Sequence, residues 1–97
     1  MHVISRRPLQ DFSAIQGDAE SPLKTWFKAA SAGRFSDLVE LKQTFGNVDY
    51  VRAGGKGFYV FDIGGNKYRL IARVDFEEQM LLIQTVMTHE KYNRERP

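Results

Sequence analysis

The sequence predicts an α+β domain, in which helices come first along the chain and an antiparallel sheet follows. Three observations support this class. The first part of the chain carries apolar residues at helical spacing, the second half carries them at the alternating spacing of strands, and short turn-forming segments separate those strands. This order is typical of helices that pack on one face of a single antiparallel sheet.

The composition fits one small globular domain spanning residues 1–97. A chain of 97 residues has room for a single core, and 42% hydrophobic residues are too many for a disordered chain. No apolar run reaches about 18 residues and no secretory signal is visible, so we expect a cytoplasmic protein outside the membrane. The lack of cysteine excludes disulfides and thiolate chemistry, and the net charge of +2 only weakly favours an anionic partner.

Two to three helices are predicted in the first half of the chain, after a short strand over residues 2–5. The first helix covers residues 8–16 and has a proline in its first turn, where the missing N–H would be unpaired anyway. The second helix has Ser21 as its N-cap, with a proline next, and ends at Gly33. A short third helix is predicted to open at Ser36-Asp37 and to end near residues 45–47.

Three further features could be functional but have a plainer interpretation. Trp26 and Phe27 could stack on nucleic-acid bases, yet their helical spacing with other apolar residues favours the core. His2 has no visible partner and is interpreted as a surface residue. The glycine-rich segment 54–57 lacks the spacing of a P-loop and precedes a strand, so it is interpreted as a flexible hairpin loop with Lys56 as a possible phosphate contact.

Three strands joined by short connections are predicted in the second half. They cover residues 58–63, 67–76 and 80–87, and the segment 64–66, Gly-Gly-Asn, is a tight hairpin signal between the first two. A short acidic turn joins the second strand to the third. The strands therefore form an antiparallel meander, and the N-terminal strand can join the same sheet.

The strand over residues 67–76 has one apolar and one basic face. Every second residue, beginning with Tyr68, points to the core, because side chains alternate across a strand. Lys67, Arg69 and Arg73 point the other way. Two guanidinium groups on one face could hold successive phosphates, or one phosphate between them. The alternative is a solvated outer face whose charges only keep the protein soluble.

The end of the last strand adds titratable groups to this basic face. In an antiparallel pair, that end lies beside the start of the central strand, so His89 and Tyr92 should approach Lys67 and Arg69. An imidazole transfers protons near neutral pH, and a guanidinium stabilises charge on a five-coordinate phosphorus. This set suits phosphodiester chemistry without a metal, and the acidic residues form no metal-ligand pattern with His89.

With these pieces in place, the chain resembles the HigB-type toxins, a branch of the RelE-like mRNA interferases from bacterial type II toxin–antitoxin modules. The resemblance covers nearly the whole chain. It is strongest over residues 61–72 and 86–92, in the patterns Gly-Gly-Asn-x-x-Arg and Met-Thr-His-x-x-Tyr. It implies a RelE-like fold and an endoribonuclease that cuts mRNA in the A site of the 70S ribosome. The ribose 2′-OH attacks the adjacent phosphate, with no metal or cofactor, and a HigA-like helix-turn-helix antitoxin neutralises the toxin.

The resemblance also implies roles for individual residues. Arg69 would stabilise the phosphate and the transition state, His89 would transfer a proton as base or acid, and Tyr92 would stack on a base or help to activate the 2′-OH. RNA or phosphate contacts are implied for four basic residues, Lys56, Lys67, Arg73 and Lys91. The sequence departs from RelE in lacking two lysines on the strand before the central one. The C-terminal helix of some relatives is missing or very short, and the charged tail over residues 93–97 is expected to be frayed.

Two other functions fit the same residues. One is a non-catalytic module that binds RNA or a protein through the basic face. The other is a degenerate toxin that still binds its antitoxin but cuts nothing. Whether the toxin is active or degenerate, residues 34–56 could form the surface that the antitoxin covers, since this segment carries few strong structural signals.

Overall fold

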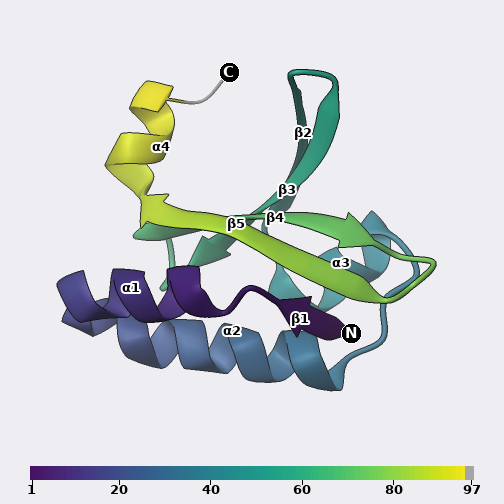
Figure 1. Ribbon diagram of the computed structural model, residues 1–97, viewed down its shortest axis with the longest axis horizontal. Coiled ribbons are helices and arrows are strands. Elements are labelled where there is room, and N and C mark those ends of the chain that lie inside the picture. The colour runs from purple at the N-terminus through teal and green to yellow at the C-terminus, as the bar shows by residue number, and fades with distance from the viewer. Residues whose placement is uncertain (96–97) are drawn as a thin grey trace.

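The computed structural model describes residues 1–95 and has the predicted α+β class. Figure 1 shows a sheet with α1 and α2 along one side, and α4 and the tip of the β2–β3 hairpin on the other. The elements in chain order are β1 (His2–Ile4), α1 (Arg7–Ile15), the 3₁₀ turn η1 (Gly17–Ala19), α2 (Glu20–Ala32), α3 (Leu38–Phe45), β2 (Val48–Ala53), β3 (Lys56–Ile63), β4 (Tyr68–Asp75), β5 (Met80–Thr88) and α4 (His89–Glu95).

The sheet has the strand order β1-β5-β4-β3-β2. The predicted antiparallel meander is confirmed for β3, β4 and β5, and each of these strands follows its neighbour through a short turn. β1 joins the edge beside β5 as a parallel strand, with Val3 opposite Leu81, so the sheet as a whole is mixed. The helices between β1 and the meander provide the crossover that a parallel pair requires.

The strand β2 is a feature that the sequence pattern did not predict. It pairs with β3 in register from Val48 opposite Phe61 to Ala53 opposite Lys56. Its burial does not alternate, because Asp49, Tyr50 and Arg52 are all exposed at the free edge of the sheet. The apolar alternation that marks a half-buried strand is therefore absent. The segment interpreted as a flexible loop is the tip of this β2–β3 hairpin.

One predicted helix boundary changes in the structure, and a short helix is added after the last strand. Ser21 is not an N-cap: α2 already begins at Glu20, because η1 leads the chain directly into it, and the proline that follows Ser21 lies in the first turn. The third helix begins as predicted, with Asp37 as its N-cap, whose Oδ1 accepts a hydrogen bond from the Glu40 N–H at 3.0 Å. The chain continues beyond the last strand as the short helix α4, so residues 93–95 are helical rather than frayed. The end of the predicted frayed tail, residues 96–97, lies outside the described residues.

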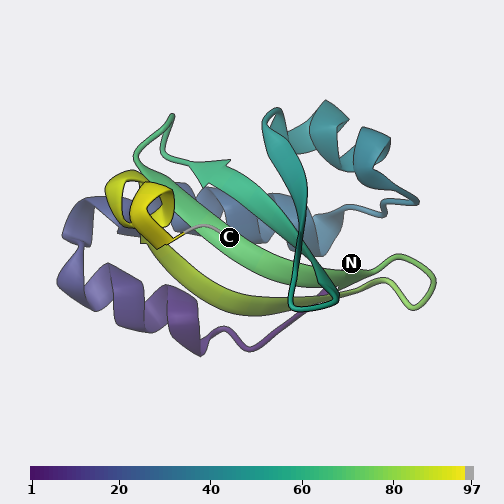
Figure 2. The same ribbon diagram turned by 90° about the horizontal axis from the view of Figure 1, so that it is seen from above.

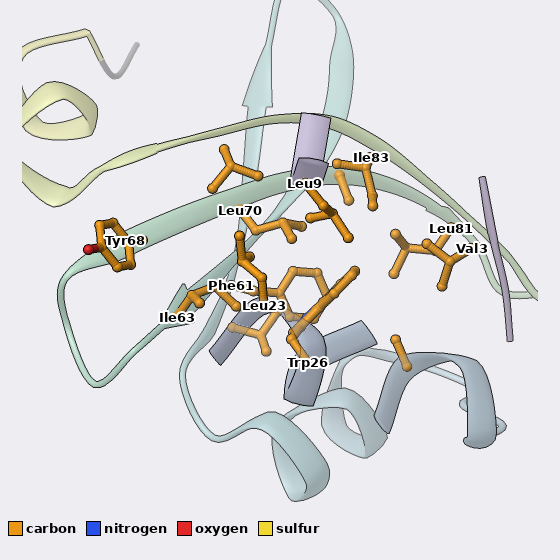
Figure 3. Close-up of a cluster of buried hydrophobic side chains, with 14 of the residues drawn as sticks. Val3, Leu9, Leu23, Trp26, Phe61, Ile63, Tyr68, Leu70, Leu81 and Ile83 are labelled. Carbon is orange, nitrogen blue, oxygen red and sulfur yellow. The ribbon is translucent and has the colours of Figure 1, made fainter. Parts of the chain in front are cut away.

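The core lies between the sheet and α2. Figure 3 shows side chains of β3, β4 and β5 directed toward Leu23 and Trp26 of α2. Phe61 is fully buried and packs edge-on against Trp26, with ring centroids 5.4 Å apart, and against Phe45, with centroids 5.2 Å apart. Trp26 is 4% exposed, which confirms the core interpretation and excludes a free stacking platform. Tyr68 is buried at the same face, as the alternation along β4 predicts.

The Tyr68 hydroxyl ties one end of β4 to the helical layer. Its Oη donates a hydrogen bond to Asp18 Oδ1 at 2.6 Å, from the strand to η1. This hydrogen bond raises the pKa of the Tyr68 phenol, and burial and the negative charge of Asp18 raise it further. The pKa of Tyr59 is raised too, first by burial and then by the neighbouring Tyr50.

These raised pKa values predict a loss of stability in alkali. The phenols ionise near pH 10 in the unfolded chain and only at higher pH in the folded protein. Their contribution to the free energy of unfolding is therefore complete below about pH 10 and is lost as the pH rises through the folded pKa. Urea unfolding from neutral to alkaline pH should show a shallower decline for Tyr68→Phe than for the wild type. Declines of equal steepness would contradict this assignment.

Candidate functional site

The turn between β3 and β4 sets the geometry of the candidate site. Gly64 and Gly65 have φ angles of +64° and +77°, a left-handed backbone that glycine adopts without steric cost. Ile63 and Tyr68 then pair across the hairpin, and the next pair is Asp62 opposite Arg69. Since Phe61 and Tyr68 point into the core, Asp62 and Arg69 both point to the opposite, outward face of the sheet.

Arg69 is only 7% exposed, although it lies on the outward face. Its Nε lies 3.1 Å from Asp62 Oδ1 in an ion pair that is itself largely buried. Nη1 donates to the backbone oxygens of Tyr68 and Asn66, and Nη2 donates to Asn66 Oδ1 at 2.7 Å. All three guanidinium nitrogens therefore contact partners inside the protein, which fixes both the position and the orientation of the guanidinium group.

His89 is the first residue of α4 and lies against this guanidinium. Its backbone N–H donates to the Lys67 carbonyl oxygen at 2.8 Å, which places the helix start beside the β3–β4 turn. On the ring, Nδ1 lies 2.5 Å from Arg69 Nη2, and Nε2 lies 2.9 Å from the Asn93 side-chain amide. The predicted approach of His89 to Arg69 is confirmed, and His89 contacts Lys67 through the backbone only.

Two further predicted residues lie on α4. Tyr92 is half-buried and follows His89 by three residues, so the two side chains share one side of the helix. Lys91 is exposed, and its ammonium lies 3.8 Å from Glu95. The helix thus brings a phenol close to the imidazole and leaves an exposed cation beside them.

Lys67 does not share the outward face with Arg69. It belongs to the turn before β4, so the side-chain alternation of the strand does not extend to it. Its ammonium lies 3.8 Å from Asp18 Oδ2, on η1 in the helical layer. The prediction that Lys67 and Arg69 project together is therefore wrong for the Lys67 side chain.

Arg73 and Lys56 lie away from the Arg69–His89 pair. Arg73 is exposed on the outward face, but it is four residues from Arg69, or roughly 13 Å along the strand at about 3.3 Å per residue. That spacing rules out one phosphate held between the two arginines. Lys56 lies at the tip of the β2–β3 hairpin, six residues from Asp62, or roughly 20 Å along β3 by the same rise.

An apolar floor separates the two arginines on the outward face. Its members are Val60 on β3 and Ile71 on β4, which pair directly, with Thr85 of β5 on the other side of Ile71. Val60 is only 3% exposed and is separate from the main core cluster. Figures 1 and 2 show α4 and the β2–β3 hairpin on this side of the sheet, one toward each end of the floor. A groove between α1 and α2, lined by Leu9, Leu23 and Phe27 among others, lies in the helical layer, away from this face.

Sequence reasoning missed three residues of this cluster, Asp62, Asn66 and Asn93. The sequence signal for Asp62 is only approximate, because a two-residue turn at Gly64-Gly65 would place it opposite Lys67, whereas the four-residue turn 64–67 places it opposite Arg69. No comparable signal exists for Asn66 and Asn93, whose contacts depend on how the turn and α4 fold back onto the guanidinium. In the described part of the chain, no helix is long and apolar enough to cross a membrane.

The fold and the site define a small α+β protein with an arginine, a carboxylate and an imidazole gathered at one end of its sheet. Residues 19–95 match the model of a family described as HigB_toxin, RelE-like toxic component of a toxin–antitoxin system. The chain therefore belongs to the HigB toxin family, whose partner in such a system is an antitoxin.

Curated relatives agree with this family. The chain is 33% identical over 93 residues to the "mRNA interferase toxin HigB" of Escherichia coli strain K12, an alignment that covers 96% of this chain and 88% of the relative. The "mRNA interferase HigB" of Escherichia coli O157:H7 gives the same identity and coverage. The "mRNA interferase HigB" of Escherichia coli O6:H1 is 27% identical over 94 residues, covering 97% of this chain and 90% of that protein.

Proposed function

We propose that this chain is the toxin of a type II module and acts in the cytoplasm as an mRNA interferase, an endoribonuclease that cuts translated mRNA. The observation that carries the proposal is the contact between Arg69 and His89 on the outward face of the sheet. The names of the curated relatives support the same activity.

The reaction proposed is transesterification within the RNA. The ribose 2′-oxygen attacks the adjacent phosphorus, the bond from phosphorus to the 5′-oxygen breaks, and the products are a 2′,3′-cyclic phosphate and a 5′-hydroxyl. The 2′-OH loses a proton and the leaving 5′-oxygen gains one. His89 supplies proton-transfer chemistry at this step, and Tyr92 stacks on a base or helps to activate the 2′-OH. Arg69 stabilises the phosphate charge when an Nη N–H exchanges Asn66 for a phosphoryl oxygen.

The outward face offers a path for a single strand of RNA. The half-buried Ile71 provides apolar surface for bases, and Arg73 lies at a distance that suits a second phosphate beyond the one at Arg69. Lys91 on α4 and Lys56 at the hairpin tip extend the positive charge at the two ends of this face. Lys67 contributes a phosphate contact only if its ammonium leaves Asp18.

We propose that the ribosome presents the substrate. A net charge of +2 and few phosphate contacts predict weak, salt-sensitive affinity for free RNA. Binding in the A site of the 70S ribosome would supply the orientation that the toxin alone lacks. A HigA-like helix-turn-helix antitoxin would be the partner, and the segment 34–56, with the exposed Val39 and Tyr50, is the surface proposed for it.

A reconstituted translation reaction tests this function. A defined mRNA is incubated with the protein, with and without ribosomes, and new 5′ ends are mapped by primer extension. We expect cuts only on translated message. Cuts on naked RNA would support nuclease activity but contradict the proposed role of the ribosome. No cuts in either reaction would contradict the activity and favour a binding module or a degenerate toxin.

A further inference from the structure

The contact between Arg69 and His89 carries information about where the imidazole proton lies. A guanidinium has N–H donors and no acceptor. Because Arg69 Nη2 lies at hydrogen-bond distance from His89 Nδ1, that ring nitrogen must accept the bond through its lone pair. A ring whose Nδ1 is an acceptor carries its hydrogen on Nε2.

The second contact of the ring must then be rearranged. The Asn93 atom that lies 2.9 Å from Nε2 is Nδ2, an N–H donor like the guanidinium nitrogen at Nδ1. A neutral ring has only one acceptor nitrogen, and Asp62 and Asn66 fix the guanidinium, so the exposed Asn93 amide turns over and accepts from the Nε2–H through Oδ1. Asn93 is exposed and lies one helical turn beyond His89, where a phosphoryl oxygen can replace it.

We propose that Arg69 is a positioning residue for His89 and that it holds the imidazole in the Nε2–H form, so that His89 presents a hydrogen-bond donor to RNA. Asp62 and Asn66 are positioning residues in turn, since they fix the guanidinium through its Nε and Nη2. The inference rests on the proposed function for its substrate, the RNA phosphate.

This arrangement divides the roles of the two ring nitrogens. While Arg69 contacts Nδ1 and a hydrogen occupies Nε2, the ring has no free lone pair and does not accept the 2′-OH proton. It acts as a hydrogen-bond donor, which narrows the proton-transfer role proposed above, because a neutral ring that lost its Nε2–H would become an imidazolate. The Nε2–H binds a non-bridging or leaving oxygen of the phosphate, where negative charge grows as the bond to the 5′-oxygen breaks. Water takes up the proton of the 2′-OH and supplies the proton that the 5′-oxygen gains.

Nitrogen NMR of the histidine rings tests the assignment without reference to activity. The sample is the full chain labelled with ¹⁵N at histidine, and His2→Gln assigns the two rings, since His2 and His89 are the only histidines. We expect wild-type His89 to show an unprotonated Nδ1 and a protonated Nε2. In Arg69→Lys, which keeps the charge but loses the two-pronged guanidinium, we expect mixed tautomers like those of the exposed His2.

A wild-type His89 that carries hydrogen on Nδ1 would overturn the proposal. The same is true of a tautomer preference that Arg69→Lys leaves unchanged. Because the wild-type spectrum alone decides the tautomer, the test does not depend on how well the variant folds. If the wild type cuts no RNA, the proposed function fails while the tautomer is still determined.

A double-mutant cycle tests whether Arg69 acts through the ring. Cleavage rates are compared for Arg69→Lys, His89→Ala and the double variant. Arg69 also contacts the phosphate, so Arg69→Lys still lowers the rate of the His89→Ala protein, but if Arg69 acts through His89 the fold-loss is smaller there than in the wild type. Losses that multiply would show that Arg69 acts independently of His89 and would overturn the positioning role.

A matched pair of carboxylate variants tests whether Asp62 supports cleavage by holding Arg69. Asp62→Asn removes the charge that holds Arg69, and we expect a loss in cleavage rate of about tenfold or more, as for other outer partners that orient a functional imidazole. Asp49→Asn makes the same change at an exposed position on β2 and should leave the rate unchanged. Equal rates for the two variants would show that Asp62 does not position Arg69 for cleavage.

Discussion

His89→Ala should lower the rate of RNA cleavage by about 10²–10³, the range for removal of one hydrogen-bond donor to the charge that develops in the transition state. The residue is the first of α4 and touches Arg69, and its backbone rather than its side chain joins the helix to the β3–β4 turn. The alanine variant should therefore keep its fold. Single-turnover cleavage of a defined mRNA in the reconstituted translation reaction measures the loss.

The second histidine provides the matched control. His2 is exposed at the start of β1, so His2→Ala should cut at the wild-type rate. Circular dichroism and thermal unfolding of both variants show whether either change disturbs the fold. A His89→Ala protein that cuts within about twofold of the wild type would remove His89 from the catalytic group, because a hydrogen-bond donor to the transition state is worth far more.

Phe61→Ala should lower the free energy of unfolding by about 3–5 kcal/mol. Phe61 is fully buried at the centre of β3 and packs edge-on against Trp26 and Phe45, so its loss leaves a cavity between the sheet and two helices. Domains of this size are stable by only about 5–15 kcal/mol, so the variant should be close to unfolding. Urea unfolding followed by tryptophan fluorescence measures the change, since Trp26 is the only tryptophan.

Two controls place this effect in the core. Phe61→Leu keeps most of the apolar volume and should cost much less than Phe61→Ala. Val39→Ala removes an apolar side chain that is 62% exposed on α3, and should change the free energy of unfolding by no more than about 0.5 kcal/mol. A cost for Phe61→Ala as small as that of Val39→Ala would show that the ring does not hold the layers together.

Much of the fold could be predicted because local signals agree with the global arrangement. The glycine pair at Gly64-Gly65 and the alternation along β4 predict the central hairpin and its buried face, and Asp37 predicts the start of α3. Signals failed where the long-range context decides. β2 is a strand because β3 lies beside it, and α2 begins early because η1 precedes it.

The part of the candidate site on β4 was predictable from the sequence, whereas the side-chain positions in the turn before β4 were not. The approach of His89 to Arg69 follows from the antiparallel pairing of β4 and β5. Lys67 was misplaced because it lies one residue before the strand, where alternation no longer fixes the side chain and Asp18 attracts the ammonium instead. The burial of Arg69 was not predictable, because periodicity assigns a side chain to a face and does not show what covers it there.

The sheet register has a consequence for the order of folding. Asp62 and Arg69 are seven positions apart, so their pairing closes a short loop at little entropic cost, whereas His2 pairs with Met80, 78 positions away. We expect the β3–β4 hairpin to form early and the β1 edge to close last. Destabilising changes at Val3 should then mainly speed unfolding, while changes within the hairpin should slow folding itself.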